Sequence, residues 1–220
     1  MEIIDNIKKN QLFSDLSDEE IKLIAGLATV KTIPKNSFVF SEGDSASSFY
    51  MIKEGRVNVT VTNEDGKELI LSTLQAGDNF GELSIIDDNP RSANIYTLEN
   101  CIFIILQKAD FYQILKQNPV VGINMIKSLC QRIRFITSIA HDLALLDIYG
   151  RLVKLLLENS TADESGHRIV TMPLTQQEIA SRLGGSREMV NQILNALKKG
   201  GYLTVENKII TIKQKLPPAY

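Results

Sequence analysis

The sequence predicts an α+β protein in which an N-terminal β domain, a long helix and a C-terminal helix-turn-helix domain follow one another. Three observations predict this order. Apolar residues alternate with a period of two between Thr32 and about Gln107, in short runs separated by glycine turns. Residues 122–143 carry apolar side chains at spacings of four and three, typical of a heptad seam. Two short helical patterns around Gly184 and Gly185 then precede a hairpin pattern.

A short helix and a series of strands are expected in the first part of the chain. Ser17 and Glu20 form a capping box, and apolar residues follow it at helical spacing. Turn signals separate the strands by roughly 8–12 residues, as in an all-β barrel or sandwich. The turns contain Gly43, Gly55, Gly66 and Gly77. The strands contain residues 38–40, 49–52, 57–61, 69–71, 95–96 and 102–105.

One stretch, residues 80–93, combines residue types that suit an anionic ligand. Gly81 can adopt positive φ and lets a ligand approach the backbone, and about one turn of helix after it presents free amides. Arg91 matches phosphate oxygens bidentately, while Pro90 fixes the backbone before it. Ser92 adds further donors. The stretch therefore predicts a phosphate site.

Glu82 cannot serve the same phosphate, because two negative charges repel each other. Its carboxylate is better placed as the acceptor for a sugar hydroxyl. An acid for ribose beside a base for phosphate describes a nucleotide. The alternative is a surface turn in which Arg91 pairs with Asp87 or Asp88.

The motifs Gly81-Glu82-Leu83 and Pro90-Arg91-Ser92-Ala93 together resemble the phosphate-binding cassette of cyclic-nucleotide-binding domains. The resemblance implies a jelly-roll β-roll over residues 1–118. It implies that Arg91 pairs with the exocyclic oxygens of the cyclic phosphate and that Glu82 takes the ribose 2′-hydroxyl. Gly81 and Ser92 would supply donors. Because cyclic-GMP-selective relatives tend to carry threonine at the position of Ser92, the expected ligand is cyclic AMP.

A long helix over residues 119–146 is expected to make the chain a dimer. Pro119 is favoured at a first helical position, and a shorter helix over residues 109–116 precedes it. A heptad seam flanked by polar and charged residues is typical of a parallel two-stranded coiled coil, although the same apolar residues could also pack into a single globular core. The seam contains Gly122, Ile126, Leu129, Ile133, Ile136, Ala140 and Leu143, flanked by Lys127, Gln131, Arg132 and Arg134.

Residues 142–147 resemble the end of the dimerisation helix in the catabolite activator protein/fumarate-nitrate reduction regulator family of bacterial transcription regulators. In that family the helix of the opposite subunit closes over the nucleotide base. By this match Thr137 would reach the base, with Ser138 a less favoured reader, unless Thr137 is only a polar flank of the seam. The ligand-binding residues implied are Gly81, Glu82, Leu83, Arg91, Ser92, Arg132, Thr137 and Ser138.

Residues 147–220 are predicted to form a winged helix-turn-helix domain. Residues 147–151 are the expected hinge, because Gly150 interrupts a helical pattern. A polar loop is expected at residues 159–167. The two helices, each opened by a capping residue, and the wing strands are expected at residues 175–183, 186–199, 203–205 and 209–212, with a turn at 206–208.

Residues 186–190 resemble the recognition helix of the same family, and an arbitrary helical hairpin is the alternative. Arg187 would donate two hydrogen bonds to guanine, and Glu188 would accept one from the cytosine amino group. Gln192 stands where the best-known relative carries arginine, so that relative's half-site is not assumed in full. The expected DNA-contacting residues are Thr175, Gln176, Ser186, Arg187, Glu188, Asn191 and Gln192.

Charge is unevenly distributed along the chain. The net charge is −2, but residues 168–220 hold eight Lys or Arg and three Glu, or +5, which leaves −7 for residues 1–167. A basic C-terminal end suits a polyanion, although a solvated face would look the same. Cys101 and Cys130 are too few and too far apart for a disulfide framework or a thiolate cluster.

The sequence also argues against several classes of protein. No stretch approaches the eighteen or so apolar residues of a membrane span and no signal-peptide pattern opens the chain, so we expect a soluble, cytoplasmic protein with no membrane partner. His141 and His167 lie outside the β region, which argues against a metal-dependent enzyme on a double-stranded β-helix. We therefore expect no metal site and no enzymatic activity.

The expected function is that of a homodimeric, cyclic-nucleotide-gated transcription regulator. The resemblance implies cyclic AMP as allosteric ligand, a pseudo-palindromic operator in double-stranded DNA, and RNA polymerase as a further partner. The alternative keeps the DNA-binding dimer but replaces cyclic AMP with another signal, or with none. An iron–sulfur sensor is not supported, since the sequence lacks the N-terminal cysteine cluster.

Overall fold

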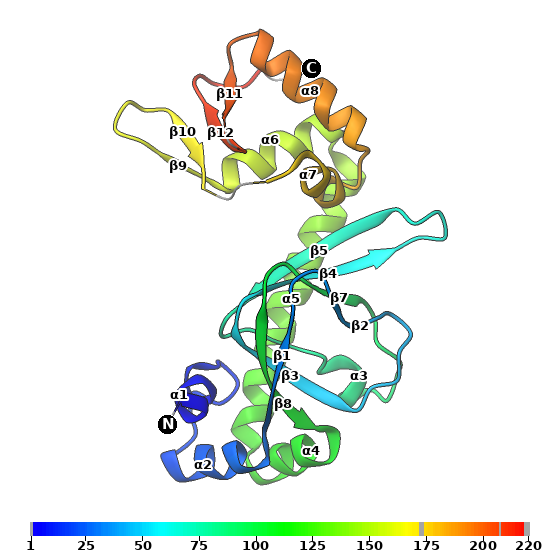
Figure 1. The fold of residues 1–220 in the computed structure, drawn as a ribbon, viewed down its shortest axis with the longest axis vertical. Coiled ribbons are helices and arrows are strands. Elements are labelled where there is room, and N and C mark those ends of the chain that lie inside the picture. The colour runs from blue at the N-terminus through cyan, green and yellow to red at the C-terminus, as the bar shows by residue number, and fades with distance from the viewer. Residues whose placement is uncertain (1, 172–173, 207, 218–220) are drawn as a thin grey trace. The chain divides into compact units, whose positions relative to one another are not determined.

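A computed structural model describes residues 2–171, 174–206 and 208–217 and divides the chain into two compact units (Figure 1). The first unit comprises residues 1–61 and 70–134, and the second comprises residues 62–69 and 135–220. Helix α5 (Pro119–Leu145) contributes residues to both. The functional division into a nucleotide-binding domain (residues 1–118), a dimerisation helix (residues 119–146) and a DNA-binding domain (residues 147–220) stays a prediction.

Two four-stranded antiparallel sheets form the centre of the first unit, in the orders β1-β8-β3-β6 and β2-β7-β4-β5. Phe103 and Ile105 of β8 point into the core between the sheets, while Ile104 and Leu106 point to the helices. Both faces of β8 are therefore buried. The strands are β1 (Thr29–Ile33), β2 (Phe38–Phe40), β3 (Ser48–Glu54), β4 (Arg56–Thr62), β5 (Glu68–Gln75), β6 (Asn79–Phe80), β7 (Asn94–Thr97) and β8 (Cys101–Gln107).

Helices cover the outer face of the first sheet. Phe49 of β3 stacks on Phe111 of α4 with the ring centroids 4.4 Å apart, and Val121 and Met125 of α5 join the same core. The predicted capping box opens α2, where the Glu20 amide donates to Ser17 Oγ at 3.3 Å. The helices of this unit are α1 (Glu2–Lys9), α2 (Asp18–Leu27), α3 (Leu83–Ile86), α4 (Lys108–Gln117) and the first part of α5.

The second unit packs three helices on a small sheet of order β11-β12-β10-β9 around its own apolar core. The predicted second capping box is present, with the Glu178 amide donating to Thr175 Oγ1 at 3.1 Å. The elements are α6 (Ile148–Glu158), β9 (Ser160–Ala162), β10 (Arg168–Val170), α7 (Gln176–Leu183), α8 (Arg187–Lys199), β11 (Leu203–Glu206) and β12 (Ile209–Ile212). The predicted α+β class is confirmed. In the wing turn expected at residues 206–208, Asn207 lies outside the described residues.

Three local features differ from what the sequence alone indicated. Helix α1 was not foreseen, and the polar loop at residues 159–167 contains strand β9, whose backbone pairs with β10 although its side chains give no apolar alternation. The break between α5 and α6 lies at Leu146 and Asp147, so it overlaps the expected hinge at residues 147–151 only at Asp147 and does not involve Gly150. Asp147 caps α6, accepting from the Gly150 amide at 2.7 Å, so Gly150 lies within the helix.

The apolar stripe of α5 is only partly as expected. Ile126 and Ile133 are exposed, at 58% and 65%, and Ile136 is exposed as well. Leu129 instead packs against the helical core of the first unit. Leu129 therefore stabilises its own unit, and the exposed apolar face of α5 contains the three isoleucines. None of the helices among the described residues combines the length and the apolar run needed to cross a membrane.

Gly55 should be intolerant of a side chain. At φ +93°, an added Cβ would lie 2.6 Å from Cys101 Sγ and 2.8 Å from the Asn100 carbonyl. Gly55→Ala is expected to lower the free energy of unfolding by roughly 2–5 kcal/mol, since backbone strain and overpacking add. Gly77→Ala is the matched control, because φ there is +95° but no described atom lies within 4 Å. Urea unfolding followed by circular dichroism compares them, and equal losses would contradict the packing argument.

Candidate functional site

Arg91 is a buried cation at the centre of the predicted cassette, with 4% of its surface exposed. Its Nη1 donates to the Gly81 carbonyl at 2.8 Å, and its Nη2 donates to the Ser48 carbonyl at 2.7 Å. The guanidinium also lies 4.1 Å from the centroid of the Phe40 ring. Its Nε has no hydrogen-bond partner in the part of the chain that the structure describes. The alternative pairing of Arg91 with Asp87 or Asp88 is wrong, and Asp88 pairs with Lys108.

Burial is the largest influence on the charge of this arginine. It lowers the pKa of the Arg91 guanidinium, while Tyr50, Glu82 and Asp44 raise it. An arginine starts from a pKa so high that the side chain keeps its proton at neutral pH. Arg91 therefore offers a desolvated positive charge, which attracts a phosphate more strongly than a hydrated charge does.

Gly81 makes the position of Arg91 possible. Its φ is +83°, and a Cβ there would lie 2.7 Å from Arg91 Nη1. The expectation of a positive-φ glycine is thus met, but the closest neighbour is the arginine of the chain itself. The backbone of Arg91 is also held, since its amide donates to the Asp44 carbonyl and its carbonyl accepts from the Gly43 amide.

Glu82 is the second buried ionic group of the cassette, and only 2% of its surface is exposed. Its Oε1 accepts from Arg132 Nη1 at 2.6 Å, and Arg132 Nη2 also donates to the Asn79 carbonyl. Its Oε2 accepts no hydrogen bond among the described residues. A buried carboxylate oxygen without a donor is an unmet acceptor, which a ligand hydroxyl could satisfy.

Two side chains outside the expected set hold the cassette in place. Tyr112 Oη donates to the Ile85 carbonyl at 2.9 Å and so ties α4 to the end of α3. Ser84 Oγ donates to the Pro90 carbonyl at 3.1 Å. Sequence reasoning missed these residues and the carbonyl groups of Ser48 and Asn79, since a backbone acceptor leaves no signal in residue type. The expected contact residues Leu83 and Ser92 are both exposed.

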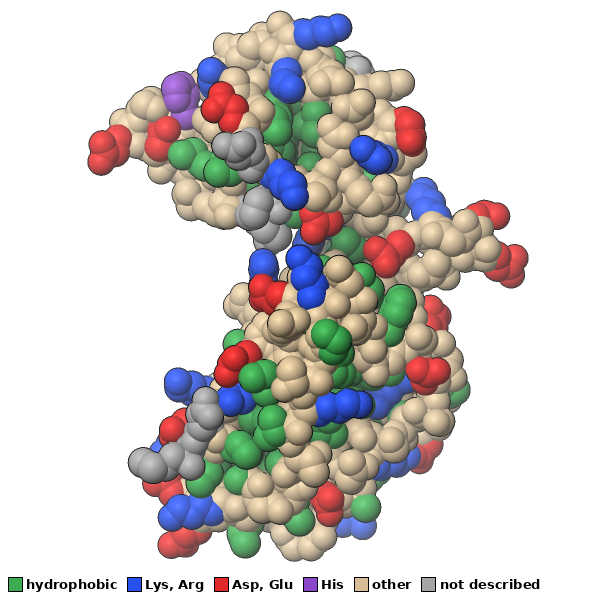
Figure 2. Space-filling model, viewed as in Figure 1, with side chains coloured by type: hydrophobic (Ala, Val, Ile, Leu, Met, Phe, Trp, Pro, Cys, Tyr) green, Lys and Arg blue, Asp and Glu red, His purple; other side chains and the backbone are tan. Residues whose placement is uncertain are grey.

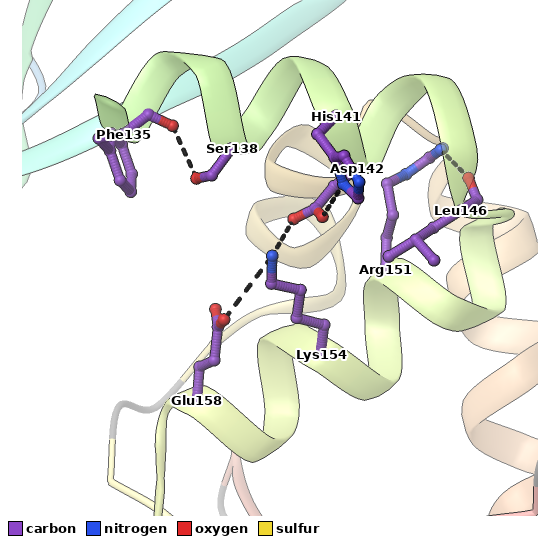
Figure 3. Close-up of polar contacts among 8 residues, drawn as sticks. All are labelled: Phe135, Ser138, His141, Asp142, Leu146, Arg151, Lys154 and Glu158. Carbon is purple, nitrogen blue, oxygen red and sulfur yellow. Dashed lines mark hydrogen bonds and ion pairs between the residues drawn. The ribbon is translucent and has the colours of Figure 1, made fainter. Parts of the chain in front are cut away.

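The residues predicted to reach the base lie on α5 within the second unit. Ser138 Oγ donates to the Phe135 carbonyl one turn earlier, at 2.8 Å (Figure 3), so its proton is already used within the helix. Thr137 and Ser138 are both exposed. Their contact with a nucleotide needs a second subunit and stays a prediction.

The junction between α5 and α6 is held by charged side chains (Figure 3). Asp142 of α5 pairs with Lys154 of α6, which also lies 3.8 Å from Glu158. Arg151 donates to the Leu146 carbonyl at the end of α5, at 2.7 Å, and to the Leu183 carbonyl at 2.9 Å. The hydrogen bond from Lys154 lowers the pKa of the Asp142 carboxyl, so this pair stays ionised at neutral pH.

The helix-turn-helix presents most of the expected residues to solvent, whereas Thr175 and Gln176 are half-buried. Gly184 closes α7 in the left-handed conformation at φ +65°, and Ser186 caps α8 by accepting from the Met189 amide at 3.2 Å. The apolar side of α8 is buried in the core of the unit. The exposed side carries Arg187, Glu188, Asn191, Gln192 and Asn195. Gln176, half-buried at the start of α7, contacts Asn191.

Charge alone does not mark a DNA-binding face. On the side of the molecule shown in Figure 2, Lys and Arg side chains of the second unit are interspersed with acidic ones. The exposed side of α8 also carries both Arg187 and Glu188. The predicted interface therefore rests on the geometry of α8 and not on a single basic patch.

Comparison with known families matches both units. Residues 30–118 match the family model described as a cyclic nucleotide-binding domain. Residues 150–215 match the model described as a Crp-like helix-turn-helix domain. Together the two matches cover the cassette and the recognition helix.

The chain is similar to regulators of several bacteria. It is 31% identical over 182 residues to the CRP-like cAMP-activated global transcriptional regulator of Mycobacterium tuberculosis, covering 81% of each chain. It is 31% identical over 186 residues to the cAMP-activated global transcriptional regulator CRP of Pasteurella multocida, covering 81% of this chain and 87% of that one. The c-di-GMP-responsive global regulator CLP of Xanthomonas campestris has a similar fold, with a TM-score of 0.80 and 23% identity, covering 90% of this chain and 100% of that one.

The pairing of Glu82 with Arg132 yields a prediction about stability. Arg132→Met should lower the free energy of unfolding of the first unit by roughly 1.5–3 kcal/mol, because it leaves a buried carboxylate without its charged donor. Adding Glu82→Gln should recover part of that loss. Arg56→Met, in an ion pair whose partners are about half exposed, should cost less than about 1 kcal/mol. Urea unfolding measures all three, and an Arg132→Met protein as stable as the parent would refute the role of the pair.

Proposed function

The chain belongs to the CRP/FNR family of DNA-binding transcription regulators, and on that premise we propose that it is a homodimeric regulator gated by cyclic AMP. Members of this family are not enzymes. The observation that carries the proposal is the pair of buried ionic groups in the cassette. Arg91 and Glu82 each retain one polar atom that has no hydrogen-bond partner among the residues the structure describes.

The two groups suit the cyclic phosphate and the ribose of a cyclic nucleotide. A cyclic phosphate is an anion that a desolvated guanidinium binds, and a ribose 2′-hydroxyl is a donor that Glu82 Oε2 can accept. Gly81, Leu83 and Ser92 would line the same ligand, with Arg132 holding Glu82. Cyclic AMP is favoured over cyclic GMP because Ser92 replaces the threonine of cyclic-GMP-selective relatives and because the regulators of M. tuberculosis and P. multocida are named as cAMP-activated.

A second subunit would complete the site. We assign the dimer interface to the exposed isoleucines of α5. In that dimer, Thr137 of the opposite copy would reach the adenine edge, and Ser138 would be the less favoured residue for this contact. A ligand that contacts both subunits in one arrangement of the dimer, and fewer groups in a second arrangement, shifts the equilibrium toward the first. Two recognition helices read a pseudo-palindrome when they lie about 34–36 Å apart. RNA polymerase is the expected further partner.

One observation favours a second candidate. Both terminal nitrogens of Arg91 already donate to carbonyl groups of the chain, as they would in a regulator that works without a phosphate ligand. The alternative is therefore the same DNA-binding dimer, constitutively active or responsive to another signal. The similar fold of the c-di-GMP-responsive regulator of X. campestris is compatible with this alternative.

Linkage between ligand and DNA tests the gating. The affinity for cyclic AMP and cyclic GMP is measured by calorimetry at fixed salt, with and without a duplex selected from random sequences. The duplex should raise the affinity for cyclic AMP roughly 5- to 150-fold, by the factor with which the nucleotide raises DNA affinity. Arg91→Ala should weaken nucleotide binding at least about tenfold, whereas Arg56→Ala, outside the cassette, should bind like the parent.

Each arm of this experiment has its own contrary result. Equal nucleotide affinity with and without duplex rules out gating and favours the constitutive alternative. Tighter binding of cyclic GMP overturns the choice of ligand. Unchanged binding by Arg91→Ala shows that the cassette is not the site.

The α5 interface is tested by its exposed isoleucines. Replacing Ile133 and Ile136 together with lysine should produce monomers and abolish operator binding, because four like charges would meet in an apolar interface. Replacing Leu23 and Leu27 of α2, which are also exposed, with lysine is the matched control. Sedimentation equilibrium reports the mass of each variant. A dimer that survives the isoleucine changes places the interface elsewhere.

A further inference from the structure

Three side-chain amides meet on the exposed side of the recognition helix. Gln176 Nε2, at the first position of α7, donates to Asn191 Oδ1 at 3.0 Å. Asn195 Nδ2, one turn further along α8, donates to the same oxygen at 3.1 Å. Asn191 and Asn195 are exposed and Gln176 is half-buried. One end of the Asn191 amide is therefore held by two partners, from two different helices.

This arrangement limits what Asn191 can read. An asparagine recognises adenine by using both ends of its amide at once, accepting from N6 and donating to N7. The amide oxygen has two lone pairs, and here both have a protein donor. Turning all three amides over exchanges donors and acceptors at each contact and again occupies one whole end of Asn191. In either arrangement a two-ended contact with adenine is unavailable.

We propose that Gln176 and Asn195 are positioning residues that restrict Asn191 to a one-ended contact with DNA, presenting its NH₂ group to acceptor atoms in the major groove. Guanine O6 and N7, adenine N7 and thymine O4 all accept such a donor. The base pair that faces Asn191 should therefore be weakly specified, in contrast to the position that faces Arg187. This inference rests on the proposed function, because it requires that α8 enter the major groove.

Freeing the amide should change the operator preference although Asn191 itself is unchanged. In the Gln176→Ala/Asn195→Ala variant, both ends of Asn191 become available, and adenine should become favoured at one position. A good two-ended pair discriminates by about 1–3 kcal/mol, or roughly 5- to 150-fold in affinity. The same preference should vanish when Asn191→Ala is added.

A second variant keeps the test independent of helix stability. Gln176→Glu places an acidic residue at the first position of α7, where the helix dipole favours it, so the helix should be retained. Its carboxylate can only accept, so it should draw the NH₂ group of Asn191 and turn the oxygen toward DNA. The preference should then move to bases that present an amino group, adenine N6 or cytosine N4.

The experiment measures competition among all single-base variants of a selected duplex, with cyclic AMP present, using the full chain. The proteins are the parent, Asn191→Ala, Gln176→Ala/Asn195→Ala, the triple variant and Gln176→Glu, each checked by circular dichroism. We expect less than about tenfold discrimination by Asn191 in the parent, and about tenfold or more, for adenine, in the double variant.

Two results would overturn the inference while the proposed function stands. One is a parent that already prefers adenine about tenfold at the position where Asn191→Ala loses the preference. The other is an unchanged base preference in both Gln176→Ala/Asn195→Ala and Gln176→Glu. A parent that binds all duplexes alike, with no base preference at any position, refutes operator recognition itself, and the inference with it.

Discussion

The burial of Glu82 beside Arg132 is the constraint on which the ligand site depends. A carboxylate that leaves water needs a charged donor to remain stable, and the donor here comes from α5. The cassette and the first part of the long helix are therefore held together by one ion pair within the first unit. A ligand hydroxyl that bound Glu82 Oε2 would act on a group that α5 already contacts. A bound ligand would therefore act directly on a contact of α5, the helix expected to form the dimer.

The second buried charge imposes a different condition. Arg91 is satisfied by the carbonyl groups of Gly81 and Ser48, so a phosphate has to compete with them for guanidinium donors. The affinity for a ligand then reflects a difference between two sets of hydrogen bonds, and not the full strength of either. Arg91 Nε, which has no hydrogen-bond partner within the described part of the chain, is the donor that costs least to recruit, because it exchanges no existing bond.

Residue type and spacing were enough to predict most strands of the first unit, the wing strands, both capping boxes and the helix-turn-helix, because each depends on neighbours close in sequence. They also identified Arg91 and Glu82 as the charged centre of the cassette. They could not predict that Leu129 faces its own core, that β9 pairs with β10, or that Ser48 and Asn79 supply carbonyl acceptors. These features depend on tertiary packing and on backbone groups that every residue carries. The link between Gln176 and Asn191 was hidden for the same reason, since the two residues lie on different helices.

The contact between Gly81 and Arg91 has a consequence for how this sequence can diverge. Any side chain at position 81 would occupy the space of the guanidinium and would also be strained at φ +83°, so the arginine adds a packing requirement to a conformational one. The two positions should therefore be inherited as a unit. In a descendant that no longer needs the arginine, the packing requirement at position 81 disappears and only the positive φ still favours glycine, so loss of the arginine should come before any substitution of the glycine.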